Sequence, residues 1–437
     1  MMHCGPHDII NTPLPCNWLD VQSPHEPVCE YLPENPVLFN KTYLSEGSFG
    51  KVSLHTKDNV IFDRSNTVID FCNIHTNTCI VKKKLHRYDN HEKHISNEVN
   101  ILWMLSHLPQ KYNVYFPIIY GYQNNVVDND NIFYFDGDDK ENIKIPEFAE
   151  DGYYGGHYGG LRSDDISIYQ TYSGVTLYTY MTEYAPIPFD KVTRIMMFIS
   201  KALCVLHACQ LCHYDLKPQN ITIKLDEDGA IKGVNLIDFG VSRLIQNNKA
   251  YLILRNNSGF FAELCEESIS GNHLYSGPEV FDDSDIRTQM SDIWNIGSIF
   301  VELLTGIPVS ILLIINDNND INDMSYEKIC ELRATTKIWN NVMFPISLAR
   351  YESKGSFSVY TVVKIFLTKF FDSNPDIANK YVPSFIHDIS SAFIYFKYGV
   401  TTWKRISSHE LFKSIKKLFV YNKIHSKSNI KVPLITP

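Results

Sequence analysis

The stretch His213-Tyr-Asp-Leu-Lys-Pro-Gln-Asn220 decides how this 437-residue sequence is interpreted. Five further stretches lie around it in a fixed order. Any one of them could be accidental, but their joint order could hardly be. They are Tyr43-Leu-Ser-Glu-Gly-Ser-Phe-Gly-Lys-Val52, Cys79-Ile-Val-Lys82 and Ser96-Asn-Glu-Val-Asn-Ile-Leu102 upstream, and Leu236-Ile-Asp-Phe-Gly240 and Asp292-Ile-Trp-Asn-Ile-Gly297 downstream.

Together these stretches resemble the eukaryotic-type serine/threonine protein kinases. The central stretch is similar to the catalytic loop H-R-D-L-K-P-x-N of that family. The resemblance implies that Asp215 orients the acceptor hydroxyl and accepts its proton, and that Lys217 neutralises the γ-phosphate of ATP. It also implies that Asn220 and Asp238, the aspartate of a D-F-G motif, hold Mg²⁺. The expected reaction is transfer of the γ-phosphoryl group of Mg-ATP to hydroxyls of protein substrates.

The stretch that ends at Val52 resembles the Gly-rich loop of the family. Gly47 and Gly50 stand where bare backbone can approach phosphate oxygens, and Val52 is expected to cover the adenine. Ser45 stands where the first glycine is usual and is expected to distort the loop slightly. Taken alone, this stretch would fit an ordinary hairpin turn about as well.

The stretch 79–82 resembles the V-A-I-K strand of the family, which implies that Lys82 bridges the ATP phosphates and Glu98. Lys83 and Lys84 compete for this role. We expect Lys83 to face solvent because neighbouring side chains of a strand point to opposite faces. On the same alternation Ile80 shares the face of Lys82, where an alanine is usual, and is expected to narrow the purine site.

Residues 166–177 resemble the strand and hinge that contact adenine in this family. Backbone amides near Thr171 and Ser173 are expected to hydrogen-bond the base, and Gln170 is the expected gatekeeper.

Two features concern the support of the catalytic loop. Asp292 is expected, by the resemblance, to brace the loop through its backbone. Tyr214 replaces an arginine that in many kinases holds a phosphorylated residue of the activation segment. Activity is therefore not expected to require that phosphorylation.

The resemblance implies an α+β, bilobal fold, with a small antiparallel-sheet N-lobe that carries one main helix and a larger, mainly helical C-lobe. A proline-rich segment precedes this domain, and a loop rich in Asn, Asp, Gly and Tyr interrupts it. The expected divisions are an N-terminal tail at 1–36, a kinase domain at 37–420 with an N-lobe at about 37–172 and a C-lobe at about 173–420, insertions near 58–75 and 124–165, and a C-terminal tail at 421–437.

Composition narrows the partners. A net charge of −9 argues against a general nucleic-acid binder and favours basic protein substrates. The apolar run 298–315 is interrupted by Glu302 and Pro308, so we expect a buried helix followed by a loop, and no membrane span. The N-terminus lacks the pattern of a secretory signal, so an intracellular location, in the cytoplasm or nucleus, is expected. The oligomeric state stays open.

Several alternatives remain. Cys209-Gln-Leu-Cys212-His213 matches the pattern for covalent haem attachment, but His213 also opens the longer and more specific catalytic-loop stretch. A kinase-like scaffold without catalysis and a kinase for lipids or small molecules both keep the fold. The many Asn, Ile and Tyr residues resemble kinases encoded by large DNA viruses, and AT-rich cellular genomes leave the same imprint.

Overall fold

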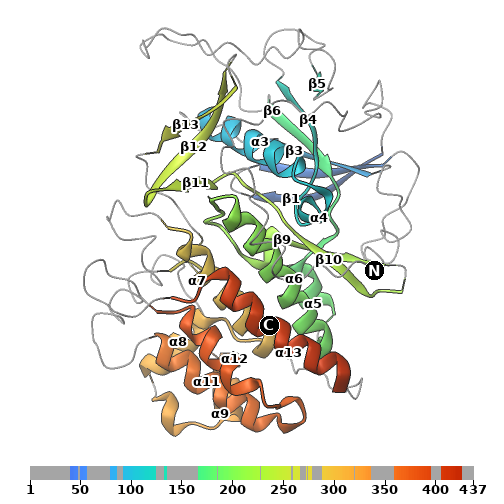
Figure 1. The fold of residues 1–437 in the computed structure, drawn as a ribbon. Coiled ribbons are helices and arrows are strands. Elements are labelled where there is room, and N and C mark those ends of the chain that lie inside the picture. The colour runs from blue at the N-terminus through green and yellow to red at the C-terminus, as the bar shows by residue number, and fades with distance from the viewer. Residues whose placement is uncertain are drawn as a thin grey trace.

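The computed structural model describes most of the chain between Asn40 and His425 (Figure 1). The described residues are 40–47, 50–56, 79–85, 92–124, 132–134, 166–184, 186–226, 228–256, 259–265, 272, 274–277, 288–318, 320–335, 359–394 and 405–425. The predicted tail at 1–36 and the predicted insertion at 58–75 lie outside them.

The N-terminal part is a six-stranded antiparallel sheet in the order β1-β2-β3-β6-β4-β5. The small antiparallel sheet predicted for the N-lobe is therefore present. Strand β5 falls within the stretch expected to be a loop insertion and pairs with β4. The strands are β1 (Asn40–Gly47), β2 (Gly50–Thr56), β3 (Cys79–Leu85), β4 (Ile119–Asn124), β5 (Ile132–Tyr134) and β6 (Ile166–Thr171).

One long helix, α3 (Glu92–Ser106), packs beside this sheet, as the sequence predicted (Figure 1). Its buried apolar residues recur at helical spacing. The Ser106 hydroxyl donates to the Leu102 carbonyl at 2.7 Å and accepts from the Ile119 amide at 3.0 Å, which joins the end of the helix to β4. The short helix α4 (Gln110–Asn113) follows. The buried apolar residues of α3 include Val99, Leu102 and Leu105.

The connection between the two parts of the molecule passes through Gly174. This residue has a φ of +98°, and a Cβ atom here would lie 2.1 Å from the Ile223 carbonyl oxygen. Only glycine fits such a close approach. Strand β7 (Val175–Thr176) and helix α5 (Leu177–Glu183) follow, and the Thr176 hydroxyl caps α5 by accepting from the Thr179 amide at 3.0 Å.

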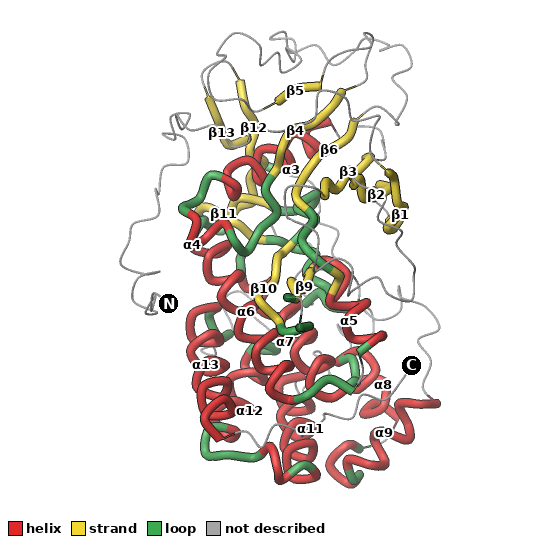
Figure 2. The backbone as a smooth tube through the Cα atoms, turned by 90° about the vertical axis from the view of Figure 1, so that its right-hand side faces the viewer, coloured by secondary structure: helices red, strands yellow, loops and turns green. Residues whose placement is uncertain are grey.

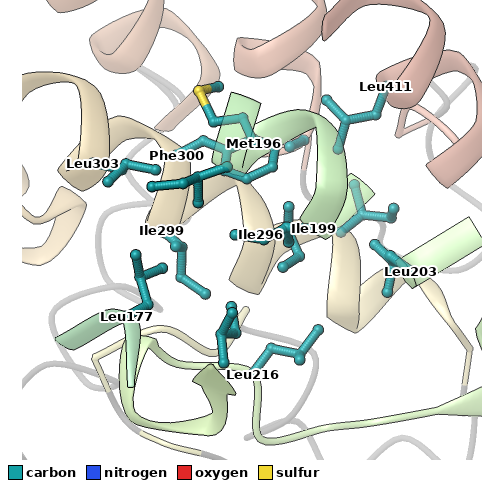
Figure 3. Close-up of a cluster of buried hydrophobic side chains, with 14 of the residues drawn as sticks. Leu177, Met196, Ile199, Leu203, Leu216, Ile296, Ile299, Phe300, Leu303 and Leu411 are labelled. Atoms are coloured by element: carbon teal, nitrogen blue, oxygen red, sulfur yellow. The ribbon is translucent and has the colours of Figure 1, made fainter. Parts of the chain in front are cut away.

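The C-terminal part is mainly helical, as predicted, around a continuous apolar core (Figure 3). Leu216, from the centre of the catalytic-loop stretch, points into this core beside Ile296 and Ile299, so the loop is anchored by burial as well as by hydrogen bonds. The helices are α6 (Phe189–Ala208), α7 (Met290–Thr305), α8 (Val309–Asn318), α9 (Tyr326–Thr335), α11 (Val359–Ser373), α12 (Val382–Ser391) and α13 (Ser408–His425), with 3₁₀ turns at Pro218–Asn220 (η5), Ile321–Asp323 (η7) and Pro375–Ile377 (η8).

Two helix boundaries differ from the expectations. The run 298–315 was expected to leave its helix for a loop after Pro308, but α8 forms there. Proline is tolerated just before a helix because its φ suits the first turn. In the described residues no single helix is long and apolar enough to cross a membrane, and α7 and α8 reach that length only when joined across an 82° bend. Helix α13 continues to His425, past the predicted domain end at 420.

Two smaller antiparallel sheets complete the fold. Strands β9 (Ile221–Leu225) and β10 (Ile231–Leu236) form a hairpin that pairs with β7. The second sheet has the order β13-β12-β11-β8 and rises beside α3 in both views (Figures 1 and 2). Its strands are β8 (Leu211–Cys212), β11 (Arg243–Gln246), β12 (Lys249–Asn256) and β13 (Gly259–Leu264).

Candidate active site

The segment from His213 to Asn220 is held by a buried aspartate of α7. Asp292 Oδ2 accepts from the His213 amide at 2.8 Å, and Oδ1 accepts from the Tyr214 amide at 2.9 Å. Tyr214 has a φ of 63°, a left-handed conformation that is uncommon for a residue other than glycine. These two hydrogen bonds hold it there. The predicted role of Asp292 as a brace of the loop backbone is confirmed.

A neighbouring histidine influences the pKa of Asp292, and a second residue of α7 also binds the loop. Burial alone would raise the pKa of Asp292, but its contact with His207 Nε2 at 3.1 Å helps to hold that pKa below the ordinary value. Asn295, one turn further along α7, donates to the Leu216 carbonyl at 3.1 Å. Asn295 was not predicted from the sequence, although its spacing from Asp292 places both residues on one helix face.

The three functional groups predicted on the loop lie together. Lys217 Nζ donates to Asp215 Oδ2 at 2.6 Å. The Asn220 side-chain amide donates to the same oxygen at 2.9 Å and to the Asp215 carbonyl at 2.8 Å. Burial raises the pKa of Asp215, although Lys217 opposes the shift. The carboxylate is thereby held in place and made a better proton acceptor than an exposed aspartate.

Asp238 lies two residues after the end of β10. Its φ is 67°, again in the left-handed region. The next residue, Phe239, is fully buried, with its ring 6.1 Å from that of Phe116 and 4.9 Å from that of His213. Because the phenyl ring is fixed on one side, the preceding carboxylate is directed to the other, where it lies 2.7 Å from Lys83 Nζ.

The lysine of the site is Lys83, so the prediction that Lys82 fills this role is wrong. Lys83 Nζ donates to Glu98 Oε1 at 2.6 Å and to Asp238 Oδ1 at 2.7 Å. In the register of the sheet, Lys83 stands opposite the buried Ile168 of β6. The strand therefore turns this lysine to the inside, not to solvent as expected. Glu98 is the predicted partner and is confirmed as the helix glutamate of the pair.

Because the lysine of the site is Lys83 and not Lys82, the apolar residue expected beside the purine also lies one position later. Val81 is buried and, by strand alternation, shares the face of Lys83, so it stands where Ile80 was placed relative to Lys82. Val81 and Leu54 form a small cluster, against which Val52 and Tyr172 pack. The predicted Val52 therefore packs against the cluster that contains Val81. The side chain of Ile80 lies outside the described residues.

Charge balance in the buried ion-pair cluster follows from competition between burial and attraction. Burial lowers the pKa of Lys83, but the attraction of Asp238 and Glu98 outweighs it, so that pKa is raised. The pKa of Glu98 is raised, because the effect of burial is larger than the attraction of Lys83. The pKa of Asp238 is lowered, because here the attraction of Lys83 is larger than the effect of burial. The cluster therefore holds a firmly protonated lysine and an ionised Asp238.

The predicted glycines lie at the tip of the β1–β2 hairpin. Gly47 pairs with Gly50 across the two strands, and Val52 pairs with Ser45. The register shifts between Tyr43 and Ser45, which marks a β-bulge or irregularity. The expected distortion of this loop therefore falls at the position of the missing first glycine.

The hinge prediction fails for the backbone amide of Thr171, and for that of Ser173 it stays a prediction. The Thr171 amide donates to the Ile118 carbonyl at 2.9 Å, and the Thr171 hydroxyl accepts from the Ile118 amide at 3.0 Å. That backbone amide is therefore not available to a base. The Ser173 hydroxyl is buried and has no hydrogen-bond partner among the described residues. An unsatisfied buried hydroxyl indicates that this position fits a polar ligand.

The predicted metal ligands provide two oxygen donors. Because the Asn220 Nδ2 atom is used toward Asp215, its Oδ1 atom is the one left for a cation, and Asp238 supplies a carboxylate. Mg²⁺ prefers such ligands and commonly completes its shell with phosphate oxygens and water. Among the described residues no group of three or more His, Cys, Asp and Glu is placed to hold a metal by itself.

Another contact, not predicted from the sequence, joins the chain beyond β13 to α7. The Tyr275 hydroxyl donates to Glu302 Oε2 at 2.8 Å. Burial raises the pKa of Glu302 to about 7, although the Tyr275 hydrogen bond opposes this. Nothing in the sequence indicated the pair, because it depends on how the chain beyond β13 folds back onto α7.

Similarity to known proteins agrees with this geometry. The profile of the protein kinase domain family matches residues 157–423, more than half of the chain. Serine/threonine-protein kinase 36 of Mus musculus is 30% identical over 144 residues, which cover 33% of this chain and 9% of that protein. Serine/threonine-protein kinase TIO of Arabidopsis thaliana is 34% identical over 122 residues, 28% of this chain and 8% of that protein. Death-associated protein kinase 2 of Homo sapiens is 26% identical over 145 residues, 33% of this chain and 35% of that protein.

The chain therefore spans about a tenth to a third of the length of these relatives. The profile match begins after β5, so the glycine hairpin, Lys83 and Glu98 are assigned by the structure and not by the profile. The matched part contains the catalytic-loop stretch, Asp238 and Asp292. The chain belongs to the protein kinase domain family.

Proposed function

We propose that this chain is an active serine/threonine protein kinase, which transfers the γ-phosphoryl group of Mg-ATP to hydroxyls of protein substrates. The observation that carries the proposal is the convergence of Lys83, Glu98 and Asp238 within ion-pair distance. These residues come from the sheet, from α3 and from the chain after β10. Their meeting is the arrangement that phosphoryl transfer requires for aligning a nucleotide.

Each polar residue of the site has a place in this chemistry. Lys83 binds nucleotide phosphates and is oriented by Glu98, while Asn220 and Asp238 hold Mg²⁺. Asp215 orients the acceptor hydroxyl and takes its proton, which its raised pKa favours. Bound Mg²⁺ supplies neutralisation of phosphate charge.

The acceptor is proposed to be serine or threonine in a basic protein segment. Lys217, two residues after Asp215, is the form usual in serine/threonine kinases, and it contacts the Asp215 carboxylate directly. The net charge of −9 favours encounter with cationic acceptors because long-range attraction raises association rates.

The test is incubation of purified protein with Mg-ATP labelled at the γ-phosphate and two acceptor peptides of equal length, one rich in lysine and one rich in glutamate. We expect labelled serine or threonine on the basic peptide, identified by phosphoamino-acid analysis. Asp215→Asn should abolish the label. Asp372→Asn, which changes an exposed carboxylate at the end of α11, should leave it unchanged.

Two results would contradict the proposal. Label that survives Asp215→Asn would show that this residue is not the catalytic aspartate. Binding of Mg-ATP without transfer to any acceptor or to the protein itself would make a scaffold function the better account.

A further inference from the structure

The segment that follows Asp238 forms a hairpin instead of an open loop. Strands β11, β12 and β13 add to β8, which leads directly into the catalytic loop. The turn between β11 and β12 has positive φ at both Asn247 and Asn248, as a tight two-residue hairpin turn requires. The hairpin of β12 and β13 then lies along α3 (Figures 1 and 2).

Two asparagines of α3 bind one residue of β12 on both of its backbone groups. The Asn97 Oδ1 atom accepts from the Ile253 amide at 2.7 Å. Asn100 Nδ2 donates to the Ile253 carbonyl at 2.9 Å. Both asparagines are buried, and further along the same face the ring of Trp103 lies 5.0 Å from that of Phe260 in β13. The asparagines thus act toward β12 as a neighbouring strand would.

These contacts fix the rotation of α3 about its axis. Residues 97, 100 and 103 lie on one helix face, and Glu98 is turned from Asn97 by about 100°. When that face is held against β12, Glu98 is directed to Lys83. A rotation of α3 that moved the glutamate away would leave buried amide groups of Asn97 and Ile253 without partners, which is costly.

Asn97 also ties the helix to the residues after Asp238. Its Nδ2 atom donates to the Ser242 carbonyl at 2.9 Å, and the Ser242 hydroxyl donates to the His213 carbonyl at 3.2 Å. The Asn97 side-chain amide and the Ser242 hydroxyl therefore connect α3 to the segment after Asp238 and to the catalytic loop. Tyr214, at the position of the usual arginine, is buried with Cys212, Val241 and Ala250 of β12. Apolar contacts thus occupy the place of a phosphate-binding cation.

We propose that Asn97 and Asn100 are positioning residues, which latch β12 to α3 and so hold Glu98 against Lys83 without a phosphorylated residue in the segment. This inference rests on the proposed kinase function. It assigns the hairpin the task that a phosphate bound by arginine performs in many kinases.

A double-mutant cycle tests whether Asn97 acts through Glu98. The turnover number kcat is measured for wild type, Asn97→Ala, Glu98→Gln and the double variant. We expect Asn97→Ala to lower kcat about tenfold, because two buried hydrogen bonds are lost. In the Glu98→Gln background the same change should alter kcat by less than about twofold, since the residue it positions is already disabled. If the losses in kcat of the two single variants multiply in the double variant, Asn97 acts independently of Glu98, and the positioning role is overturned.

Matched variants separate positioning from general stability. Asn113→Ala removes a hydrogen bond from an asparagine of α4 to Ser106, at the far end of α3, and should leave kcat unchanged. Asn100→Ala removes a single bond to Ile253 and provides a milder variant should Asn97→Ala fail to fold. Treatment of wild type with a broad-specificity phosphatase should also leave kcat unchanged, and loss of activity on that treatment would contradict the inference.

A readout that needs no catalysis separates this inference from the function itself. Hydrogen exchange of the Ile253 amide should be faster in Asn97→Ala than in wild type, while exchange in α6 and α7 stays the same. If wild type proves inactive but exchange changes in this way, the kinase proposal fails and the latch stands. If exchange at Ile253 is unchanged, the latch fails whatever the activity.

Discussion

Replacement of Lys83 by methionine is the perturbation that most sharply separates the structure from the sequence-based assignment. Lys83→Met removes the only charge of the side chain and keeps most of its length. It leaves the buried Glu98 and the partly buried Asp238 without the ammonium group that contacts both. The adjacent change Lys82→Met removes the same charge one residue away and leaves both ion pairs intact, so it is the matched control.

The magnitude follows from the two distances. At an effective dielectric constant of about 20, contacts of 2.6 Å and 2.7 Å correspond to about 6 kcal/mol of attraction each. Much of this is offset by the desolvation of the charges, and removing one partner of a buried pair costs about 3 to 5 kcal/mol. We place Lys83→Met at the lower end, about 3 kcal/mol, because burial already raises the pKa of Glu98 and lets it take up a proton. Lys82→Met should cost less than about 0.5 kcal/mol.

Two assays measure the effect. Urea unfolding followed by circular dichroism gives the free energy of unfolding. Initial rates of labelled phosphate transfer at varied Mg-ATP give kcat/KM, which should fall about 100-fold or more in Lys83→Met because a preorganised cation at the phosphates is lost. A loss in Lys82→Met as large as that in Lys83→Met would refute the corrected assignment.

Three further predictions concern other parts of the site. The pKa of Glu302 is about 7 in the folded protein and 4.5 ordinarily, so the folded state binds this proton more tightly than the unfolded state. The resulting stabilisation is complete below pH 4.5 and is lost as the pH rises through 7. Glu302→Gln should remove up to about 3 kcal/mol of this pH dependence in urea unfolding, reduced by the partial exposure of the side chain, and an unchanged slope would contradict it. Gly174→Ala should destabilise by more than about 2 kcal/mol, whereas Gly229→Ala, with positive φ but open space around it, should cost about 1 kcal/mol; equal costs would count against the close approach at Ile223. Asp292→Asn should lower kcat about tenfold by weakening one of its two backbone hydrogen bonds, with KM for Mg-ATP unchanged, and a change in KM alone would contradict the brace.

The parts of the site that lie on contiguous motifs could be predicted from the sequence. Asp215, Lys217 and Asn220 occupy one short stretch, so their order alone brings them together. Asp292 and Asp238 could be placed because each stands within its own recognisable motif. The division into a sheet with one helix and a larger helical part also followed from the order of short apolar runs and longer periodic ones.

The choice between Lys82 and Lys83 could not be made from the sequence. Three successive lysines fit the motif in more than one frame, and strand alternation says only that neighbours face opposite ways. Which face is inside depends on the pairing of β3 with β2 and β6, and the sequence does not show this register. Burial decides the question: Lys83 is 7% exposed.

The hairpin beside α3 could be predicted only in part from the sequence. The run 249–256 followed by Asn257-Ser-Gly259 has the character of a strand and a turn, but nothing in the sequence indicates what this strand packs against. The role of Asn97 and Asn100 could not be inferred, because it depends on two elements far apart in the chain lying side by side. Asparagines are mostly exposed in folded proteins, and nothing local marks these two as buried.

The most direct test of the central claim separates nucleotide binding from chemistry. Mg-ATP affinity and single-turnover transfer of the γ-phosphoryl group to a basic serine peptide are measured for wild type and Asp215→Asn. We predict equal affinity, because Asp215 contacts neither Lys83 nor Glu98 in the ion-pair cluster, and transfer at least about 100-fold slower in the variant. Equal transfer rates in the two proteins, or no transfer by wild type at saturating Mg-ATP, would contradict the account.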